Sequence, residues 1–128
     1  MAARFTGPVA AGLVAVCSAS LSSVVTTTQD GVFSPDQAER GRVVYESHCI
    51  ACHETDFYQE KLAVWQSELV VDFFDALSAT MPAENPGGLT NAQYLDVLAY
   101  VFSITGSPAG DAELTLDTIA SIEIVTAE

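Results

Sequence analysis

The stretch of sequence that decides the fold is Cys49-Ile50-Ala51-Cys52-His53, which reads C-x-x-C-H. This spacing is typical of covalent attachment of a c-type haem. Two thiols add across the two vinyl groups on one porphyrin edge, so the cysteines must lie about one helical turn apart. The next residue then lies under the ring, where its imidazole can bind the iron. The motif therefore predicts that Cys49 and Cys52 carry one covalent haem c, with His53 as an axial ligand.

Two other interpretations of the motif stay open beside haem attachment. A bare C-x-x-C also occurs in thiol redox pairs and as half of a zinc site. A zinc site normally needs four protein ligands, and beyond the motif the only further Cys and His candidates are His48 and Cys17. A thiol redox pair needs no histidine directly after it. Haem attachment is the interpretation that uses all three residues.

Length and charge restrict the function. The chain has 128 residues, which fits one small domain, and 49% of them are hydrophobic, enough for a core. Seventeen acidic residues against four basic ones give a formal net charge of -13. Such a chain does not bind nucleic acid through its phosphates. We expect it to be steered toward a basic docking patch on a protein partner, the alternative being that the acidic residues serve only solubility.

The N-terminus, residues 1 to about 25, has the pattern of an export signal. Arg4 is its only charged residue, an apolar run extends over 9–16, and small residues follow. The run is shorter than the about 20 apolar residues of a transmembrane helix. We therefore expect cleavage, a periplasmic protein and no stable membrane insertion, with lipidation at Cys17 as the alternative. Residues 26–33 are expected to form a flexible lead-in.

A first helix is predicted from Pro35 to about His48. Ser34 suits the N-cap and Gln37 completes a capping-box pattern. Gly41 inside this helix costs about 1 kcal/mol relative to alanine, which suggests that another helix crosses closely there. His48 is expected to face solvent beside the haem edge.

A loop with a short helical turn is expected over 54–67, and a second helix is expected from Glu68 to about Ala79 with Ser67 as its cap. The apolar residues of the loop belong to the core or line a haem pocket; they are Phe57, Tyr58, Leu62 and Trp65. The apolar face of the second helix comprises Leu69, Val70, Phe73 and Leu77.

Met81 stands in a loop, 80–89, which two prolines and two glycines keep out of regular structure. A thioether is a soft ligand suited to haem iron. Pro82 favours an extended conformation at Met81, so the side chain can reach out of the loop. We predict Met81 as the second axial ligand; the alternative is a methionine that fills a gap in the core.

A last helix is predicted from Asn91 to about Thr105. Thr90 and Gln93 form a capping box and Gly106 is the stop. Tyr100 is a candidate to pack into the notch left by Gly41. The tail, 107–128, is expected to wrap over the domain or to hold one more short helix.

Over about 34–106 the chain resembles a class I (small, mono-haem) bacterial cytochrome c. The resemblance rests on Gly41-x-x-x-Tyr45, Cys49-x-x-Cys52-His53, Met81-Pro82, and the Leu89-Thr90, Tyr94 and Ala99-Tyr100 positions. It implies an all-α cytochrome c fold, with three to four main helices wrapped around one covalently attached haem. It also implies thioether bonds at Cys49 and Cys52, and axial ligation by His53 and Met81.

Within that family the chain is most similar to exported cytochromes found beside quinoprotein (PQQ-dependent) dehydrogenases, through the MPAENPGGLT stretch at 81–90 and the SPAG stretch at 107–110. One departure concerns the histidine. The family often has a glycine after it, and a proline in the next loop whose neighbourhood supplies a carbonyl to the imidazole. Here Glu54 follows His53, so the hydrogen-bond partner of the imidazole is unassigned.

These residues predict a one-electron carrier between a dehydrogenase and a respiratory acceptor, and not an enzyme. An iron with His53 and Met81 as ligands has no open site for substrate. Two alternatives are a gas-binding sensor, in which Met81 leaves the iron, and a cytochrome subunit fixed within a quinoprotein dehydrogenase complex.

Overall fold

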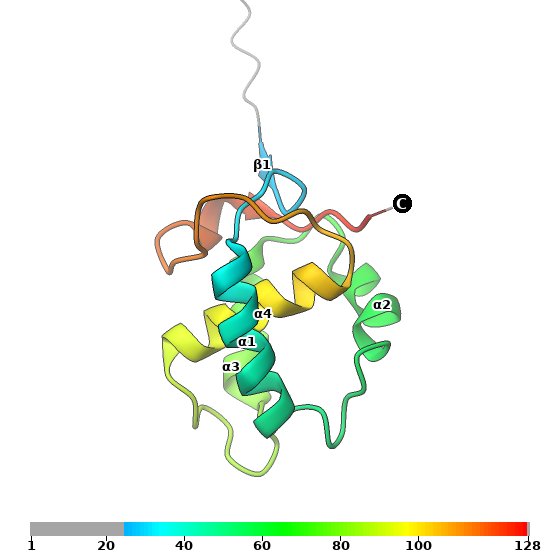
Figure 1. Cartoon of the computed structure of the whole chain (residues 1–128), viewed down its shortest axis with the longest axis vertical. Coiled ribbons are helices and arrows are strands. Elements are labelled where there is room, and N and C mark those ends of the chain that lie inside the picture. Colours follow the sequence, from blue (N-terminus) through cyan, green and yellow to red (C-terminus); the bar gives the residue numbers. More distant parts are fainter. Residues whose placement is uncertain (1–24, 128) are drawn as a thin grey trace, which may run out of the picture.

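Helices make up the body of the structure, a computed structural model that describes residues 25–127 (Figure 1). In chain order the helices are α1 (Pro35–His48), α2 (Phe57–Lys61), the 3-10 turn η1 (Leu62–Trp65), α3 (Val70–Thr80), α4 (Asn91–Ile104) and the 3-10 turn η2 (Ile119–Ser121). Two short strands, β1 (Thr26–Thr27) and β2 (Ile122–Glu123), pair in parallel. The predicted all-α architecture is confirmed. The predicted export signal, residues 1 to about 25, lies outside the described residues except for Val25, and so does Cys17.

Among residues 25–127, no helix combines the length and the apolar character that crossing a membrane would require.

The predicted bounds of α1 are confirmed, but its N-terminus differs in one contact. The Ser34 side chain accepts a hydrogen bond from the Gln37 amide (3.0 Å), as expected of an N-cap. The capping box is wrong, because the Gln37 side chain turns inward. Its Nε2 donates to the Leu114 carbonyl (3.0 Å) and its Oε1 accepts from the Leu114 amide (2.8 Å). Gln37 is buried, and its side chain provides hydrogen-bond partners for the buried amide and carbonyl of Leu114 in the tail.

α1 and α4 cross in backbone contact at Gly41, as predicted (Figure 1). A Cβ atom added there would lie 1.8 Å from the carbonyl oxygen of Asp96 and 3.0 Å from the Cβ of Tyr100. The same contact carries an ion pair, since the Arg40 guanidinium donates to both carboxylate oxygens of Asp96 at 3.1 and 3.2 Å. Glycine is therefore required by space at this position.

α3 begins at Val70, two residues later than predicted, and Ser67 does not cap it. Ser67 has a φ of 68°, and its amide donates to the Ile124 carbonyl (2.8 Å). The Ile124 amide in turn donates to the Glu68 carbonyl (2.8 Å). Pairing with the tail thus removes 67–68 from the helix. Three of the four predicted core residues of α3 are buried, whereas Leu69 is exposed.

The capping box of α4 is confirmed. Thr90 Oγ1 accepts from the Gln93 amide (3.2 Å), and Gln93 Oε1 accepts from the Thr90 amide (2.9 Å). The helix ends at Ile104, and Gly106 follows with a φ of 94°. This conformation suits glycine and stops the helix where the sequence predicts.

Both ends of the described chain pack on the helices. The lead-in, expected to be flexible, contributes Thr28 and Phe33 to the core, with exposed fractions of 0% and 1%. Thr28 Oγ1 donates to the Val125 carbonyl (2.9 Å) and accepts from the Val125 amide (3.0 Å). The tail wraps over the domain and also holds one short 3-10 turn, η2, so both expectations for it are met. Four apolar residues of the tail are buried, namely Leu114, Ile119, Ile122 and Ile124, whereas Leu116 is exposed.

We predict that Gly41→Ala lowers the free energy of unfolding by about 2–3 kcal/mol, because the added methyl group forces the two helix backbones apart. Urea unfolding of the purified holoprotein measures this. The control is Val43→Ala on the exposed face of the same helix, with an expected effect of at most about 0.5 kcal/mol. Equal stability of the two variants would contradict the close crossing.

Candidate functional site

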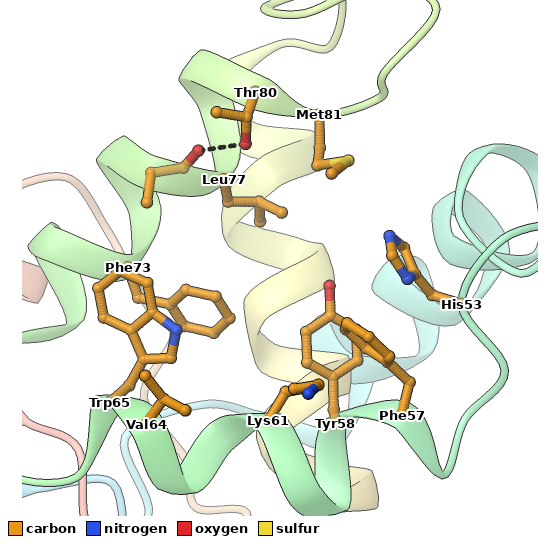
Figure 2. A pocket seen from close by; sticks show the side chains of 11 residues that line it. His53, Phe57, Tyr58, Lys61, Val64, Trp65, Phe73, Leu77, Thr80 and Met81 are labelled. Atoms are coloured by element: carbon orange, nitrogen blue, oxygen red, sulfur yellow. Dashed lines mark hydrogen bonds between the residues drawn. The ribbon is translucent and has the colours of Figure 1, made fainter.

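An apolar cleft lies between the C-x-x-C-H segment and the Met81 loop. It consists of two adjoining cavities of about 280 and 210 Å³. Both cavities are lined by His53, Tyr58, Leu77 and Met81. Cys49 and Cys52 line the smaller one, and Figure 2 shows His53 and Met81 projecting toward the cleft from opposite sides. The structure thus brings all four predicted site residues to one cleft.

The end of α1 places the two thiols at one end of the cleft. Cys49 is the C-cap of α1, and its amide donates to the Tyr45 carbonyl (2.8 Å). The chain then turns back, with the amides of Cys52 and His53 both donating to the Cys49 carbonyl, at 3.1 and 2.9 Å. His48, expected to face solvent, is exposed and borders the same cavity. The turn keeps Cys49 and Cys52 together while His53 enters the cleft.

The end of α3 presents Met81. Its amide donates to the Leu77 carbonyl (2.9 Å), and its backbone is extended, with φ -123° and ψ 151°. This conformation agrees with the one expected for a residue before Pro82. The extended backbone directs the thioether away from the helix and into the cleft (Figure 2).

The His53 imidazole lacks a hydrogen-bond partner on one nitrogen. Its Nδ1 is buried and unpaired within the described part of the chain. The tip of the ring, which carries Nε2, is directed toward the cleft (Figure 2). A metal-bound histidine usually donates its other N–H to a carbonyl or a carboxylate. The partner that the sequence left unassigned is therefore also missing among residues 25–127. The ring is held by packing instead, with its centroid 4.3 Å from that of Phe57.

Two tyrosine hydroxyls bind the main chain of the two predicted iron ligands. Tyr45 Oη donates to the His53 carbonyl and Tyr94 Oη donates to the Met81 carbonyl, each at 2.6 Å. In the sequence, both tyrosines were noted only among the positions that carry the family resemblance. The available signal was that a buried tyrosine hydroxyl usually needs a partner.

The Cys49 thiol does not have the lowered pKa of a redox-active cysteine. Burial and, to a lesser extent, the nearby Glu84 carboxylate raise the pKa of Cys49 to about 11. Reactive C-x-x-C pairs depend on a lowered thiol pKa. For the zinc alternative, no three His, Cys, Asp or Glu side chains among the described residues are grouped so that they could hold a metal ion. Neither alternative finds support in the geometry.

The wall of the larger cavity is aromatic. Of the loop residues singled out from the sequence, Phe57, Tyr58 and Trp65 line it, whereas Leu62 is buried in the core. Trp65 stacks on Phe73 at 5.0 Å between ring centroids. The Tyr58 hydroxyl points into the cleft (Figure 2), and burial raises its pKa to about 12, so it stays protonated at neutral pH.

Lys61, which sequence analysis did not single out, lines the larger cavity. Its Nζ lies 6.0 Å from the centroid of the Phe57 ring. The described part of the chain has two other cations, and both are paired: Arg40 with Asp96 and Glu113, and Arg42 with Glu39 and Glu46. Among residues 25–127, Lys61 is therefore the one lysine or arginine without an ion-pair partner.

These residues fit an iron porphyrin. The cleft offers apolar walls for the ring, an imidazole nitrogen and a thioether sulfur on facing sides, and two thiols at one end. The vinyl and carboxylate substituents of haem lie on opposite edges of the ring. A ring bonded through its vinyl edge to Cys49 and Cys52 would carry its carboxylates on the edge away from the thiols. Lys61 lines only the cavity that the cysteines do not border, so it could accompany those carboxylates.

An all-helical domain with C-x-x-C-H at the end of its first helix and a facing methionine defines a c-type cytochrome of the class I kind. The family model described as "Cytochrome C oxidase, cbb3-type, subunit III" matches residues 36–101, more than half of the chain, and the chain belongs to this family. Neither a curated protein nor a solved structure matches it significantly. Membership implies covalently bound haem c and supports a haem-containing electron-transfer cytochrome.

We predict that Lys61→Gln lowers the reduction potential by roughly 10–40 mV, because loss of a positive charge near the ring favours the ferric form. Redox titration of the purified protein measures the shift. Arg42→Gln is the matched control, since it makes the same charge change outside the cleft, and its expected shift is smaller. Equal shifts in both variants would show an effect of net charge alone.

Proposed function

We propose that this chain is an exported mono-haem cytochrome that carries single electrons between a dehydrogenase and a respiratory acceptor. The observation that supports the proposal most strongly is the arrangement of the cleft. His53 and Met81 face each other across it, and Cys49 and Cys52 line one end. Residues far apart in the sequence thus line one cleft, and this supports the proposal.

In this proposal Cys49 and Cys52 bind the porphyrin through thioethers, and His53 Nε2 and Met81 Sδ are the axial ligands. When bound, the iron supplies a reversible one-electron change between ferric and ferrous states. His53 and Met81 would both ligate the iron, which would then have no open site for substrate. A thioether ligand also favours the reduced iron and raises the potential.

The contacts of Met81 favour electron transfer over gas binding. A gas-binding sensor of this kind needs a Met81 that leaves the iron readily. Here the backbone of Met81 is bound on both sides, its amide to the Leu77 carbonyl at 2.9 Å and its carbonyl to the Tyr94 hydroxyl at 2.6 Å. These two bonds oppose the movement that ligand exchange requires.

The surface around the thiols is acidic, which favours docking of a basic partner protein. Cys52 is exposed beside the carboxylates of Glu54, Asp56 and Glu60, and Glu84 borders the cavity that Cys49 lines. We infer that electrons leave near this edge, toward a redox protein with a basic docking patch. The family description names an oxidase subunit, so an oxidase is one candidate acceptor. A quinoprotein dehydrogenase as donor and a periplasmic location are further parts of the proposal.

The ferric absorption spectrum tests the axial ligation. We predict a weak band at the red end of the wild-type spectrum that Met81→Ala abolishes, because that band reports the iron–thioether bond. Thr80→Ser is the matched control: it changes the adjacent residue but keeps the hydroxyl that donates to the Ala76 carbonyl, and it should retain the band. A five-coordinate spectrum in the wild type would contradict ligation of the iron by Met81.

The salt dependence of electron transfer tests the acidic docking surface. With a basic redox protein as partner, the second-order rate constant should fall roughly tenfold between about 10 mM and 200 mM ionic strength, as screening removes the steering. Stopped-flow absorbance measures the rate. An acidic partner is the control, and its rate should not fall. A rate with the basic partner that is constant across the series would contradict steering.

A further inference from the structure

The two tyrosine hydroxyls that bind the site form a matched pair. Tyr45 donates to the main-chain carbonyl of His53, and Tyr94 donates to that of Met81, both at 2.6 Å, which is short for an O–H···O hydrogen bond. Both side chains are buried, with exposed fractions of 0% and 2%. Each proposed iron ligand is therefore held by one buried phenol through its own backbone.

The two phenols come from opposite sides of one rigid contact. Tyr45 lies one turn beyond Gly41 on α1, and Tyr94 lies two residues before Asp96 on α4. The Asp96 carbonyl is the atom that Gly41 allows to approach. The helix crossing thus fixes the relative position of the two hydroxyl donors.

Neighbouring rings hold each phenol in place. The Tyr45 ring lies 5.2 Å from that of Tyr100 between centroids, at an interplanar angle of 60°. The Tyr94 ring lies 6.1 Å from that of Phe74 on α3, edge to face at 81°. Neither phenol can move far without disturbing an aromatic neighbour.

The ligands themselves have few other anchors. His53 Nδ1 has no hydrogen-bond partner within residues 25–127, so the usual means of fixing a ligating imidazole is missing there. Met81 follows the last residue of α3, outside regular structure. The amides of both ligands bond only within their own segments, His53 to the Cys49 carbonyl and Met81 to the Leu77 carbonyl, each at 2.9 Å. The two carbonyls are therefore the points at which side chains of the crossing helices hold the ligands.

We propose that Tyr45 and Tyr94 are positioning residues for the iron ligands, which transmit the geometry of the α1–α4 crossing to His53 and Met81. This inference rests on the proposed axial ligation. Tyr94 keeps Met81 in reach of the iron in both oxidation states and opposes its exchange for external ligands. Tyr45 fixes the His53 backbone and, through it, the orientation of the ring.

Imidazole titration of the ferric holoprotein tests the role of Tyr94. In Tyr94→Phe, added imidazole should displace Met81 with an affinity roughly five- to tenfold higher, the change expected for loss of one hydrogen bond. Tyr100→Phe is the matched control, because it also removes a tyrosine hydroxyl from α4. The Tyr100 hydroxyl makes no hydrogen bond in the described part of the chain, and Tyr100 lines neither of the two cavities. Its imidazole affinity should equal that of the wild type.

The paramagnetic proton NMR spectrum of the ferric protein tests Tyr45. Tyr45→Phe should move the ring-proton signals of His53 more than the methyl signal of Met81, and Tyr94→Phe should do the reverse. A general loss of packing would not produce this reciprocal pattern. If one of the two variants does not mature, the other decides the question with its own readout.

The outcomes separate this inference from the proposed function. A wild-type protein without the red-end band overturns the axial ligation, and the positioning roles with it. A wild type with the band, together with variants that melt at lower temperature but keep wild-type imidazole affinity and ligand shifts, overturns the positioning roles alone.

Discussion

The backbone contact between α1 and α4 at Gly41 is the constraint on which the rest of the structure depends. α1 leads directly into the C-x-x-C-H segment, and the loop that carries Met81 leads into α4. Because Gly41 has no side chain, the Asp96 carbonyl approaches α1 directly, and the Arg40–Asp96 ion pair closes over the contact. A wider crossing would move the two halves of the cleft relative to each other.

The cleft combines loops that present reactive groups with helices that hold those loops. The thiols, His53 and Met81 all lie at or just beyond helix ends, where side chains are free to point into the cleft. The walls are apolar and aromatic, and the surrounding surface is acidic. In this environment Lys61 is the one lysine or arginine among residues 25–127 that forms no ion pair. An apolar site with one cation suits a flat ring that carries its own negative groups on one edge.

Local sequence patterns predicted most of the helical frame, because caps, prolines and glycines act over a few residues. The bounds of α1 and the capping box of α4 follow from such signals, and the Gly41 notch follows from the cost of a helical glycine. The misses involve partners far along the chain. Gln37 left its local cap for the backbone of Leu114, and Ser67 was drawn into pairing with Ile124.

The same distinction applies to the site. Residue type and spacing were enough to nominate its four central residues, and the structure brings them to one cleft. The hydrogen bonds of Tyr45 and Tyr94, and the place of Lys61 on the cavity wall, depend on how distant segments pack and have no local signature. The most direct test of the central claim is the intact mass and the alkaline pyridine absorption spectrum of protein matured in an exporting host. We predict one haem that stays attached after denaturation and two thiols that resist alkylation, whereas a colourless protein in which both Cys49 and Cys52 are alkylated would contradict covalent haem attachment.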